Sequence, residues 1–218
     1  MLRIDRMKWP ALSLALVAAC EQPTSVPSVL PMVQGAAVIA GSDRTSSSVI
    51  DKLGEVAASA RPCVGDAYGG IELVADVAPD AGDETILASY TRGIVVLGAD
   101  GHRIATSPGF GCSGSQDELV ALEVLRTSQD APVIAAAVIQ GGRRESSTRI
   151  HLFAVDATKH LDPLFTGEVE HVDGAATLGG AITFVPGGLI YRHPTNGVTL
   201  WKFDRNLRRY VDPGLRRD

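Results

Sequence analysis

The chain has 218 residues, of which 45% are hydrophobic and 21% charged, and its formal net charge is −5 at pH 7. This length suits one globular domain with its own core, and the composition excludes an intrinsically disordered chain. A net acidic protein is a poor partner for nucleic acid, whose binding depends on neutralising phosphates. Aromatic residues make up only 5% of the chain, which argues against a stacking surface for bases or sugars.

Residues 1–20 have the layout of an export signal. A positively charged start precedes an apolar run, Ala11–Ala19, that is too short to span a bilayer as a mature helix. The run ends in Val17-Ala18-Ala19-Cys20, which resembles the lipobox of bacterial lipoproteins. The resemblance implies that residues 1–19 are a lipoprotein signal peptide and that Cys20 becomes a diacylated N-terminus. It also implies delivery to the outer membrane of a Gram-negative cell, because Glu21 follows the cysteine. The alternative is an ordinary signal peptide with a coincidental cysteine.

The segment that follows contains a tether and a short helix. Residues 20–32 hold several prolines and serines without periodicity, and we expect a stiff, solvated tether there. An N-terminal segment, 33–69, begins with a candidate strand at Val33–Gly41. Ser48-Val-Ile-Asp51 then fits the capping-box pattern and opens a run of apolar residues at helical spacing. We predict an amphipathic helix over about 49–60, which either covers an open end of the core or binds a partner.

Residues 70–214 are β in character, and residues 215–218 form a basic tail. Short β-branched runs alternate with Gly, Asp and Pro, which are signals for strands and tight turns. Residues 118–127 fit neither the strand period nor the helix period cleanly, so a helix is the alternative there. The expected strands fall into three units of four: 71–77, 85–90, 93–98 and 103–106; 118–127, 133–139, 149–155 and 161–170; 177–185, 188–192, 198–203 and 208–211.

One motif recurs in each unit, as IVVLGAD at 94–100, IHLFAVD at 150–156 and VTLWKFD at 198–204. The spacings of about 56 and about 48 residues are within the range of blade-like β repeats. We therefore predict an all-β fold of three blade-like repeats of about four antiparallel strands, with one short N-terminal helix. The units would form an incomplete propeller, a sandwich or an open barrel.

Equivalent repeats carry two further expectations. Asp100, Asp156 and Asp204 should occupy the same turn position. The two residues four and three before each aspartate are apolar, as in Leu200 and Trp201, which predicts strands buried on both faces.

An acidic segment, residues 76–84, precedes the second expected strand. It resembles the calcium loop of FG-GAP and VCBS repeats, the blades of integrin-type propellers. Asp76, Asp80 and Glu84 stand at the first, fifth and ninth places of that pattern, but Ala78 stands where a further ligand is expected. The resemblance implies a calcium site, since calcium is held by several hard oxygen ligands. The alternative is a solvated acidic turn without metal.

Cys63 and Cys112 remain if Cys20 is acylated. An even pair of cysteines in an exported protein predicts a disulfide, and two free thiols are the alternative. Ser113 follows Cys112 in a loop that superficially resembles a serine-protease nucleophile loop. Cys112 stands where that family has Asp, and no matching histidine motif occurs, so a nucleophile role for Ser113 has little support.

Two basic surfaces are candidates for recognition. Arg143 and Arg144 lie between two apolar strands, so we expect them at a hairpin tip as a binding loop. Near the C-terminus, several arginines that include Arg208 and Arg209 lie beside Trp201 and Tyr210. Such a patch suits an anion or a lipid headgroup, and a solvated basic tail is the alternative.

No catalytic constellation stands out in the sequence. We expect a membrane-anchored lipoprotein of the cell envelope that acts as a non-enzymatic binding or scaffolding module, without a cofactor unless the acidic loop binds calcium. Its expected partners are the membrane, through the lipid anchor, and an envelope protein rather than nucleic acid. The alternatives are an envelope hydrolase that uses acids or Ser113, and a structural subunit whose repeats complete a ring with a partner.

Overall fold

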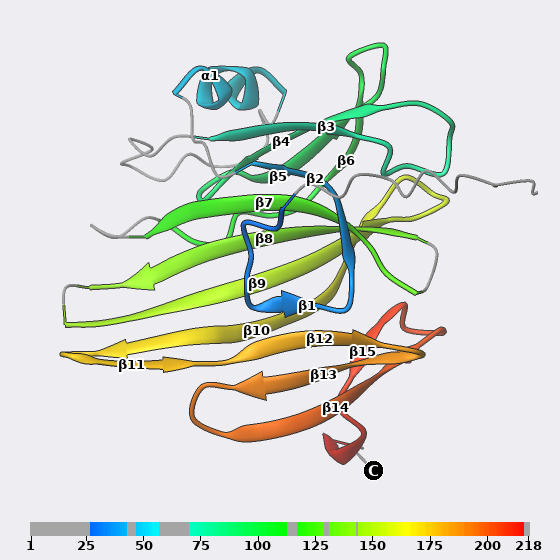
Figure 1. Cartoon of the computed structure of the whole chain (residues 1–218). Helices are drawn as coiled ribbons and strands as arrows, with labels where there is room; N and C mark the ends of the chain where they lie inside the picture. Colours follow the sequence, from blue (N-terminus) through cyan, green and yellow to red (C-terminus); the bar gives the residue numbers. More distant parts are fainter. Residues whose placement is uncertain are drawn as a thin grey trace, which may run out of the picture.

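We describe the fold from a computed structural model, which describes residues 27–42, 47–56, 70–112, 117–128, 131–142 and 144–215. In this part of the chain the strands form three sheets (Figure 1). Sheet 1 has the order β3-β4-β5-β6, sheet 2 the order β11-β10-β9-β8-β7-β2, and sheet 3 the order β1-β12-β13-β14-β15. The predicted all-β fold with three antiparallel four-stranded units is confirmed, because each predicted unit forms the body of one sheet.

The elements have the following bounds. Sheet 1 contains β3 (Ile71–Ala75), β4 (Glu84–Ser89), β5 (Gly93–Leu97) and β6 (Arg103–Thr106). Sheet 2 contains β2 (Ala37–Ser42), β7 (Glu118–Arg126), β8 (Pro132–Gly141), β9 (Glu145–Val155), β10 (Leu161–Asp173) and β11 (Ala176–Gly179). Sheet 3 contains β1 (Val33–Gln34), β12 (Ala181–Val185), β13 (Gly188–His193), β14 (Gly197–Asp204) and β15 (Arg209–Val211). The helices are α1 (Ser47–Val56) and a short 3₁₀ helix, η1 (Pro213–Leu215).

Sheet 2 is the central layer, and both of its faces are apolar. One face shares a buried cluster with sheet 1 that includes Ile134 and Ile86. The other face shares a second cluster with sheet 3 that includes Leu152 and Leu189. Since a sheet must bury its apolar face against another layer, the two clusters hold the three sheets together. Figure 1 places α1 at one end of the molecule and β14 with η1 at the other.

The segment 118–127, for which the sequence left helix and strand open, is strand β7. Its apolar side chains divide between the two clusters, with Leu122 on the sheet 1 side and Leu125 on the sheet 3 side. The pairing with β8 shifts register between Leu119 and Ala121. Such a bulge inserts one residue and breaks the alternation of side chains, which explains why neither period fitted.

The N-terminal segment contributes to all three layers. Strand β1 pairs in parallel with β12 of sheet 3, and β2 pairs with β7 of sheet 2. Helix α1 then covers the outer face of sheet 1, where Val49 and Leu53 pack with Leu87 and Val95. Of the two interpretations of the helix, the one in which it covers the β core is therefore correct for the helix face that carries Val49 and Leu53. Residues 57–60 of the predicted helix lie outside the described residues.

The last residues of the predicted tether are packed against the domain. Leu30 is buried, and the buried carboxylate of Glu123 accepts hydrogen bonds from the N–H groups of Val29 and Leu30 and from Ser28 Oγ. A carboxylate without exposure is stable only when such donors satisfy it. Residues 28–30 of the predicted tether, 20–32, therefore pack on the domain, and its residues 20–26 lie outside the described residues.

The aspartate repeat is only partly confirmed. Strands β5, β9 and β14, which carry the motif, are each the third strand of their unit. Asp156 opens its turn, with its N–H bonded to His160 O, and the residue in the same place of the first unit is Gly98, bonded to His102 O. Asp100 thus lies two residues further on, and Asp204 is still within β14, paired with Arg209. The expected common turn position is wrong: the first two turns are equally long but their aspartates stand at different places in them, and the third turn, between Asp204 and Arg209, is shorter.

The expectation of strands buried on both faces is also wrong for β14. Leu152 in β9 is fully buried, whereas Leu200 in β14 is 47% exposed. The difference follows from the layers, since β9 lies in the central sheet and β14 in a sheet covered on one face only.

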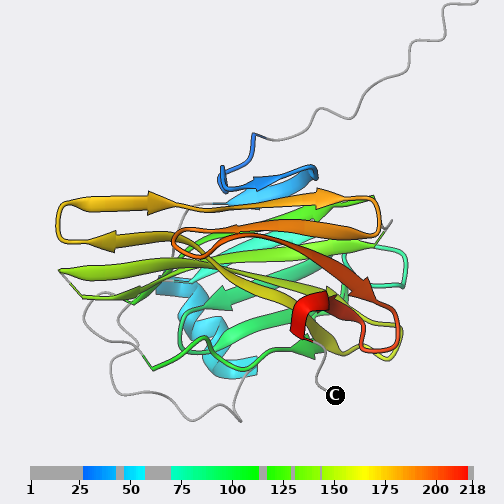
Figure 2. The same cartoon turned by 90° about the horizontal axis from the view of Figure 1, so that it is seen from below.

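Sheets 2 and 3 meet at a corner around Gly180. Strand β11 belongs to sheet 2 and β12 to sheet 3, and only Gly180 separates them. A Cβ on Gly180 would lie 2.4 Å from Arg192 O, so a larger residue does not fit at this bend. The sheets therefore curl around the second cluster, and Figure 2 shows the course of β10 to β15 from a second direction. Here the predicted strand 177–185 is split into two.

Candidate functional site

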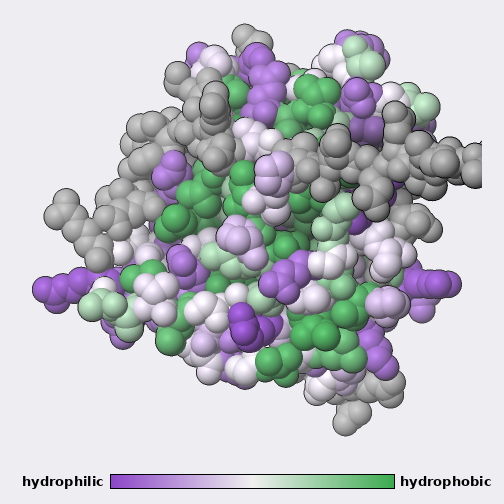
Figure 3. All heavy atoms as spheres, in the orientation of Figure 1, coloured by the Kyte–Doolittle hydropathy of each residue, from purple (hydrophilic) through white to green (hydrophobic). Residues whose placement is uncertain are grey.

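A groove of about 920 Å³ lies where the curl brings β10 close to β14 and β15. In the orientation of Figure 1, hydrophobic surface is exposed among polar residues over this part of the molecule (Figure 3). The groove is lined by residues of β10, of β14 and β15, and of the turns next to them: Pro163, Leu164, Phe165, Thr166, Trp201, Lys202, Phe203, Asp204, Leu207, Arg209, Tyr210, Val211, Asp212 and Pro213.

The inner wall of the groove is aromatic. Phe165 packs edge-on against Trp201, with ring centroids 5.0 Å apart, and against Tyr191, with centroids 5.2 Å apart. Phe203 and Tyr210 form another edge-on pair with centroids 5.3 Å apart. Burial raises the pKa of both Tyr191 and Tyr210 to about 12, so both phenols are neutral at physiological pH. Six of the eleven aromatic residues gather in this region: Phe165, Phe184, Tyr191, Trp201, Phe203 and Tyr210.

Trp201 adds an unusual polar feature to this wall. Its Nε1 is buried and has no hydrogen-bond partner in the part of the chain that the structure describes. An unpaired buried donor costs about 1–3 kcal/mol, so a carbonyl that reached this nitrogen would be bound favourably.

Gly167 allows the rings to pack closely. A Cβ at this position would lie 2.6 Å from the Phe165 ring and 2.9 Å from the Tyr191 ring. Only a residue without a side chain lets both rings lie against the β10 backbone. The glycine therefore shapes the aromatic wall without lining the groove itself.

One edge of β10 is open beside the groove. On one side β10 pairs with β9 along its length, but on the other side β11 pairs only with residues 170–173. Within the described residues, no strand pairs with this edge of β10 over 163–168. β15, the last strand of sheet 3, also has an edge without a paired strand among the described residues, where it pairs only with β14. Unpaired edges present backbone N–H and C=O groups that can pair with another chain.

Arg208 closes one end of the curl. Its guanidinium lies 3.1 Å from Asp156 Oδ2 through Nη1 and 3.2 Å from Asp162 Oδ2 through Nε. Arg208 has a φ of 50°, which is uncommon for a residue with a side chain. Hydrogen bonds from the turn and the guanidinium of Arg208 hold the pKa of Asp156 below its usual value. The ion pairs therefore fasten the last turn of sheet 3 to sheet 2.

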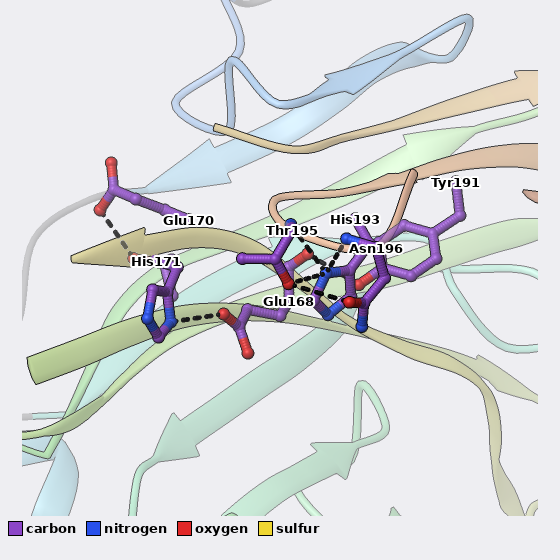
Figure 4. Close-up of polar contacts among 8 residues, drawn as sticks. Glu168, Glu170, His171, Tyr191, His193, Thr195 and Asn196 are labelled. Carbon is purple, nitrogen blue, oxygen red and sulfur yellow. Dashed lines mark hydrogen bonds and ion pairs between the residues drawn. The ribbon is translucent and has the colours of Figure 1, made fainter. Parts of the chain in front are cut away.

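A polar cluster lies at the other end of the aromatic wall (Figure 4). Tyr191 Oη donates to Glu168 O over 2.8 Å, and His171 Nδ1 lies 3.0 Å from Glu168 Oε1. His193 Nδ1 accepts hydrogen bonds from the N–H groups of Thr195, over 3.0 Å, and Asn196, over 3.2 Å. Since Nδ1 accepts, the proton of the neutral His193 ring is on Nε2. Thr195 Oγ1 also lies 3.1 Å from His193 Nδ1, and the contacts of the cluster together fix turn and strand backbone.

His151 lies on the opposite side of β10 from the open edge, in β9. Its Nδ1 is 3.1 Å from Thr166 Oγ1, and its ring is 4.8 Å from that of Phe110 between centroids. Burial and the nearby Arg149 lower the pKa of His151 from 6.5 to about 4. The ring is therefore neutral at physiological pH, and it packs as a partly polar core residue.

In the predicted calcium loop, the carboxylates of Glu84 and Asp80 already have partners within the protein. The buried carboxylate of Glu84 accepts the N–H groups of Val77, over 2.8 Å, and Ala78, over 3.0 Å. Asp80 lies 2.9 Å from Lys159 Nζ, and Asp76 is exposed. In the described ranges no group of three or more His, Cys, Asp or Glu side chains is arranged to hold a metal ion. A calcium site formed by Asp76, Asp80 and Glu84 stays a prediction, and it would require Glu84 and Asp80 to exchange their present partners.

The other predicted sites are described only in part. Cys112 is exposed and disulfide-bonded, but Cys20 and Cys63 lie outside the described residues, so the pairing of Cys63 with Cys112 stays a prediction. Arg144 is exposed at the turn between β8 and β9, and its carbonyl accepts the N–H of Gly174; Arg143 and Ser113 lie outside the described residues. Among the described helices, none is long and apolar enough to cross a bilayer.

Sequence reasoning missed the groove although a signal was present. Trp201 and Phe203 are two residues apart, a spacing that places both rings on one face of a strand. Phe165 and Gly167 show the same spacing in β10.

Comparisons with family models, curated proteins and solved structures found no match for this chain.

Proposed function

We propose that this protein is a lipid-anchored binding module of the cell envelope, and that its groove binds an extended polypeptide segment. The observation that carries the proposal is the position of an aromatic groove directly beside the open edge of β10. The anchor rests on the lipobox-like residues that end at Cys20.

A bound segment would use two features of the groove. Its backbone would pair with the free edge of β10, in the way that extended peptides add a strand to a sheet. Every second side chain would point toward Phe165, Trp201 and Phe203, since side chains alternate along a strand.

A chemical argument favours binding over hydrolysis at this site. The groove lining includes no serine, cysteine or histidine, and the His151 ring that lies 3.1 Å from its one threonine, Thr166, has no partner for Nε2 among the described residues, so no third group orients it as a base. The acids at the rim, Asp204 and Asp212, each accept N–H groups of their own turns.

The test is a selection of phage-displayed random peptides on the purified protein. Selected peptides should bind the wild-type chain and should lose affinity for Leu207→Ala, which removes an exposed side chain from the groove. Val74→Ala is the matched control, since Val74 and Leu207 are both 55% exposed and Val74 lies in sheet 1. Methylation of alternate backbone nitrogens in the peptide should abolish binding if the segment adds as a strand. Peptides that bind Leu207→Ala and the methylated form unchanged would contradict the proposal.

A further inference from the structure

The outer face of sheet 3 is the one large sheet face without a covering layer among the described elements. On sheet 1 the corresponding face is covered by α1. On sheet 3 three aliphatic side chains are exposed instead, with Ile190 at 37%, Val198 at 66% and Leu200 at 47%. Ile190 and Leu200 are direct cross-strand partners, so they form one continuous apolar patch. Contiguous exposed apolar residues mark an interaction surface more often than isolated ones do.

Cations surround this apolar patch. Arg192 lies opposite Val198, and Lys202 lies opposite Val211, on the same face as Leu200. Arg209 of β15 also points to this face, because its neighbour Tyr210 is buried inside. None of the three cations forms an ion pair within the described residues.

Carboxylates are rare on this face. In strands β12 to β15, alternation places only Asp204 on it, and that side chain turns to accept the N–H groups of Asn206 and Leu207. The face is thus apolar and cationic on a chain whose net charge is −5. A surface that is anionic at its boundary and apolar beneath would complement this face in both charge and hydrophobicity.

We propose that the outer face of sheet 3 lies on an anionic lipid surface, with Arg192, Lys202 and Arg209 at the headgroups and Ile190, Val198 and Leu200 against the acyl boundary. This inference rests on the proposed lipid anchor for its cellular setting. A second copy of the chain is a poor occupant, since a symmetric face-to-face contact would oppose the same cations.

The length of the tether agrees with this placement. Only the residues from Glu21 to Val26 separate Cys20 from Pro27, where the described chain begins. Even fully extended, the path from Cys20 to Pro27 spans at most about 25 Å. An acylated Cys20 would therefore keep the domain within contact distance of the bilayer.

The experiment uses the protein that begins at Glu21, which lacks the acylated cysteine but keeps every described residue. Vesicle flotation is measured with phosphatidylethanolamine–phosphatidylglycerol vesicles and with phosphatidylcholine vesicles. The protein should float with the anionic vesicles only, and added salt should weaken binding. The triple variant Arg192→Gln, Lys202→Gln, Arg209→Gln should bind roughly 100-fold more weakly. Val198→Ser with Leu200→Ser should also weaken binding, with the cations left in place.

A matched control removes the same charge elsewhere. The triple variant Lys52→Gln, Arg126→Gln, Arg144→Gln changes exposed cations outside sheet 3, and it should float like the wild type. Equal loss in both triple variants would overturn the inference, as would flotation with neither vesicle type. A dimer in sedimentation that Leu200→Arg dissociates would assign the face to a second copy and would also overturn it. Because this protein carries no acyl group, failure here is distinct from failure of the anchor or of peptide binding.

Discussion

Phe165 of sheet 2 and Trp201 of sheet 3 meet nearly at a right angle, with an interplanar angle of 89° and ring centroids 5.0 Å apart. The contact joins two sheets through residues of β10 and β14, between which β11, β12 and β13 intervene in the sequence. It also forms the back wall of the groove, so the stability of the curl and the binding of a ligand depend on the same rings.

Phe165→Ala should destabilise the protein by roughly 3–5 kcal/mol, because the side chain is buried and its loss leaves a cavity. Urea unfolding monitored by Trp201 fluorescence measures the change. Leu178→Ala, at an exposed position of β11, is the control and should stay within about 0.5 kcal/mol of the wild type. Equal stability of the two variants would show that the aromatic wall does not hold the sheets together.

Gly167→Ala tests the close packing against β10. The new methyl group would meet the Phe165 and Tyr191 rings, and we expect a loss of about 1–3 kcal/mol. Combining it with Phe165→Leu should recover part of the loss, since the smaller side chain makes room. Gly179→Ala is the control, because nothing lies within 4 Å of its added methyl group. A Gly167→Ala protein as stable as Gly179→Ala would refute the packing argument.

The strands could be predicted because local signals determine them. Short β-branched runs end at Gly, Asp and Pro, and these breaks fall close to the observed ends of β3 to β6. Long-range pairings could not be predicted in this way. The pairing of β1 with β12 and the approach of Phe165 to Trp201 depend on the curl at Gly180, and no local pattern specifies a contact between distant strands. The alignment of Asp100 with Asp156 failed for a related reason, since the two aspartates stand at different places in turns of equal length, and the local motif does not specify where each strand ends.

The three repeat aspartates should differ in their contribution to stability. Asp156 accepts from Thr158 N over 2.8 Å and His160 N over 2.7 Å and also binds Arg208. Asp204 accepts two turn N–H groups, whereas Asp100 is exposed and accepts only the N–H of His102. Alanine at Asp156 should cost about 2–4 kcal/mol, at Asp204 about 1 kcal/mol and at Asp100 less than about 1 kcal/mol. Thermal unfolding at one pH gives the order, and equal losses at the three sites would support the original repeat alignment instead.

His151 should make stability depend on pH. Its pKa is lowered from 6.5 to about 4 in the folded protein, so the unfolded chain takes up a proton first as the pH falls. The contribution of His151 to the free energy of unfolding is complete above pH 6.5 and should decrease as the pH falls from 6.5 to about 4. Urea unfolding at a series of pH values measures this, and His151→Gln should lose the part of the slope due to this residue. An unchanged slope in His151→Gln would exclude the residue as its source.

The proposed lipid anchor rests on acylation of Cys20. Intact-mass and peptide mass spectrometry of the protein extracted from membranes of a bacterium that expresses the full chain tests it directly. We predict an N-terminus at Cys20 that carries acyl groups, with residues 1–19 absent, and a Cys20→Ala chain that is neither acylated nor processed in this way. An unmodified Cys20 within an intact N-terminal sequence would contradict the account.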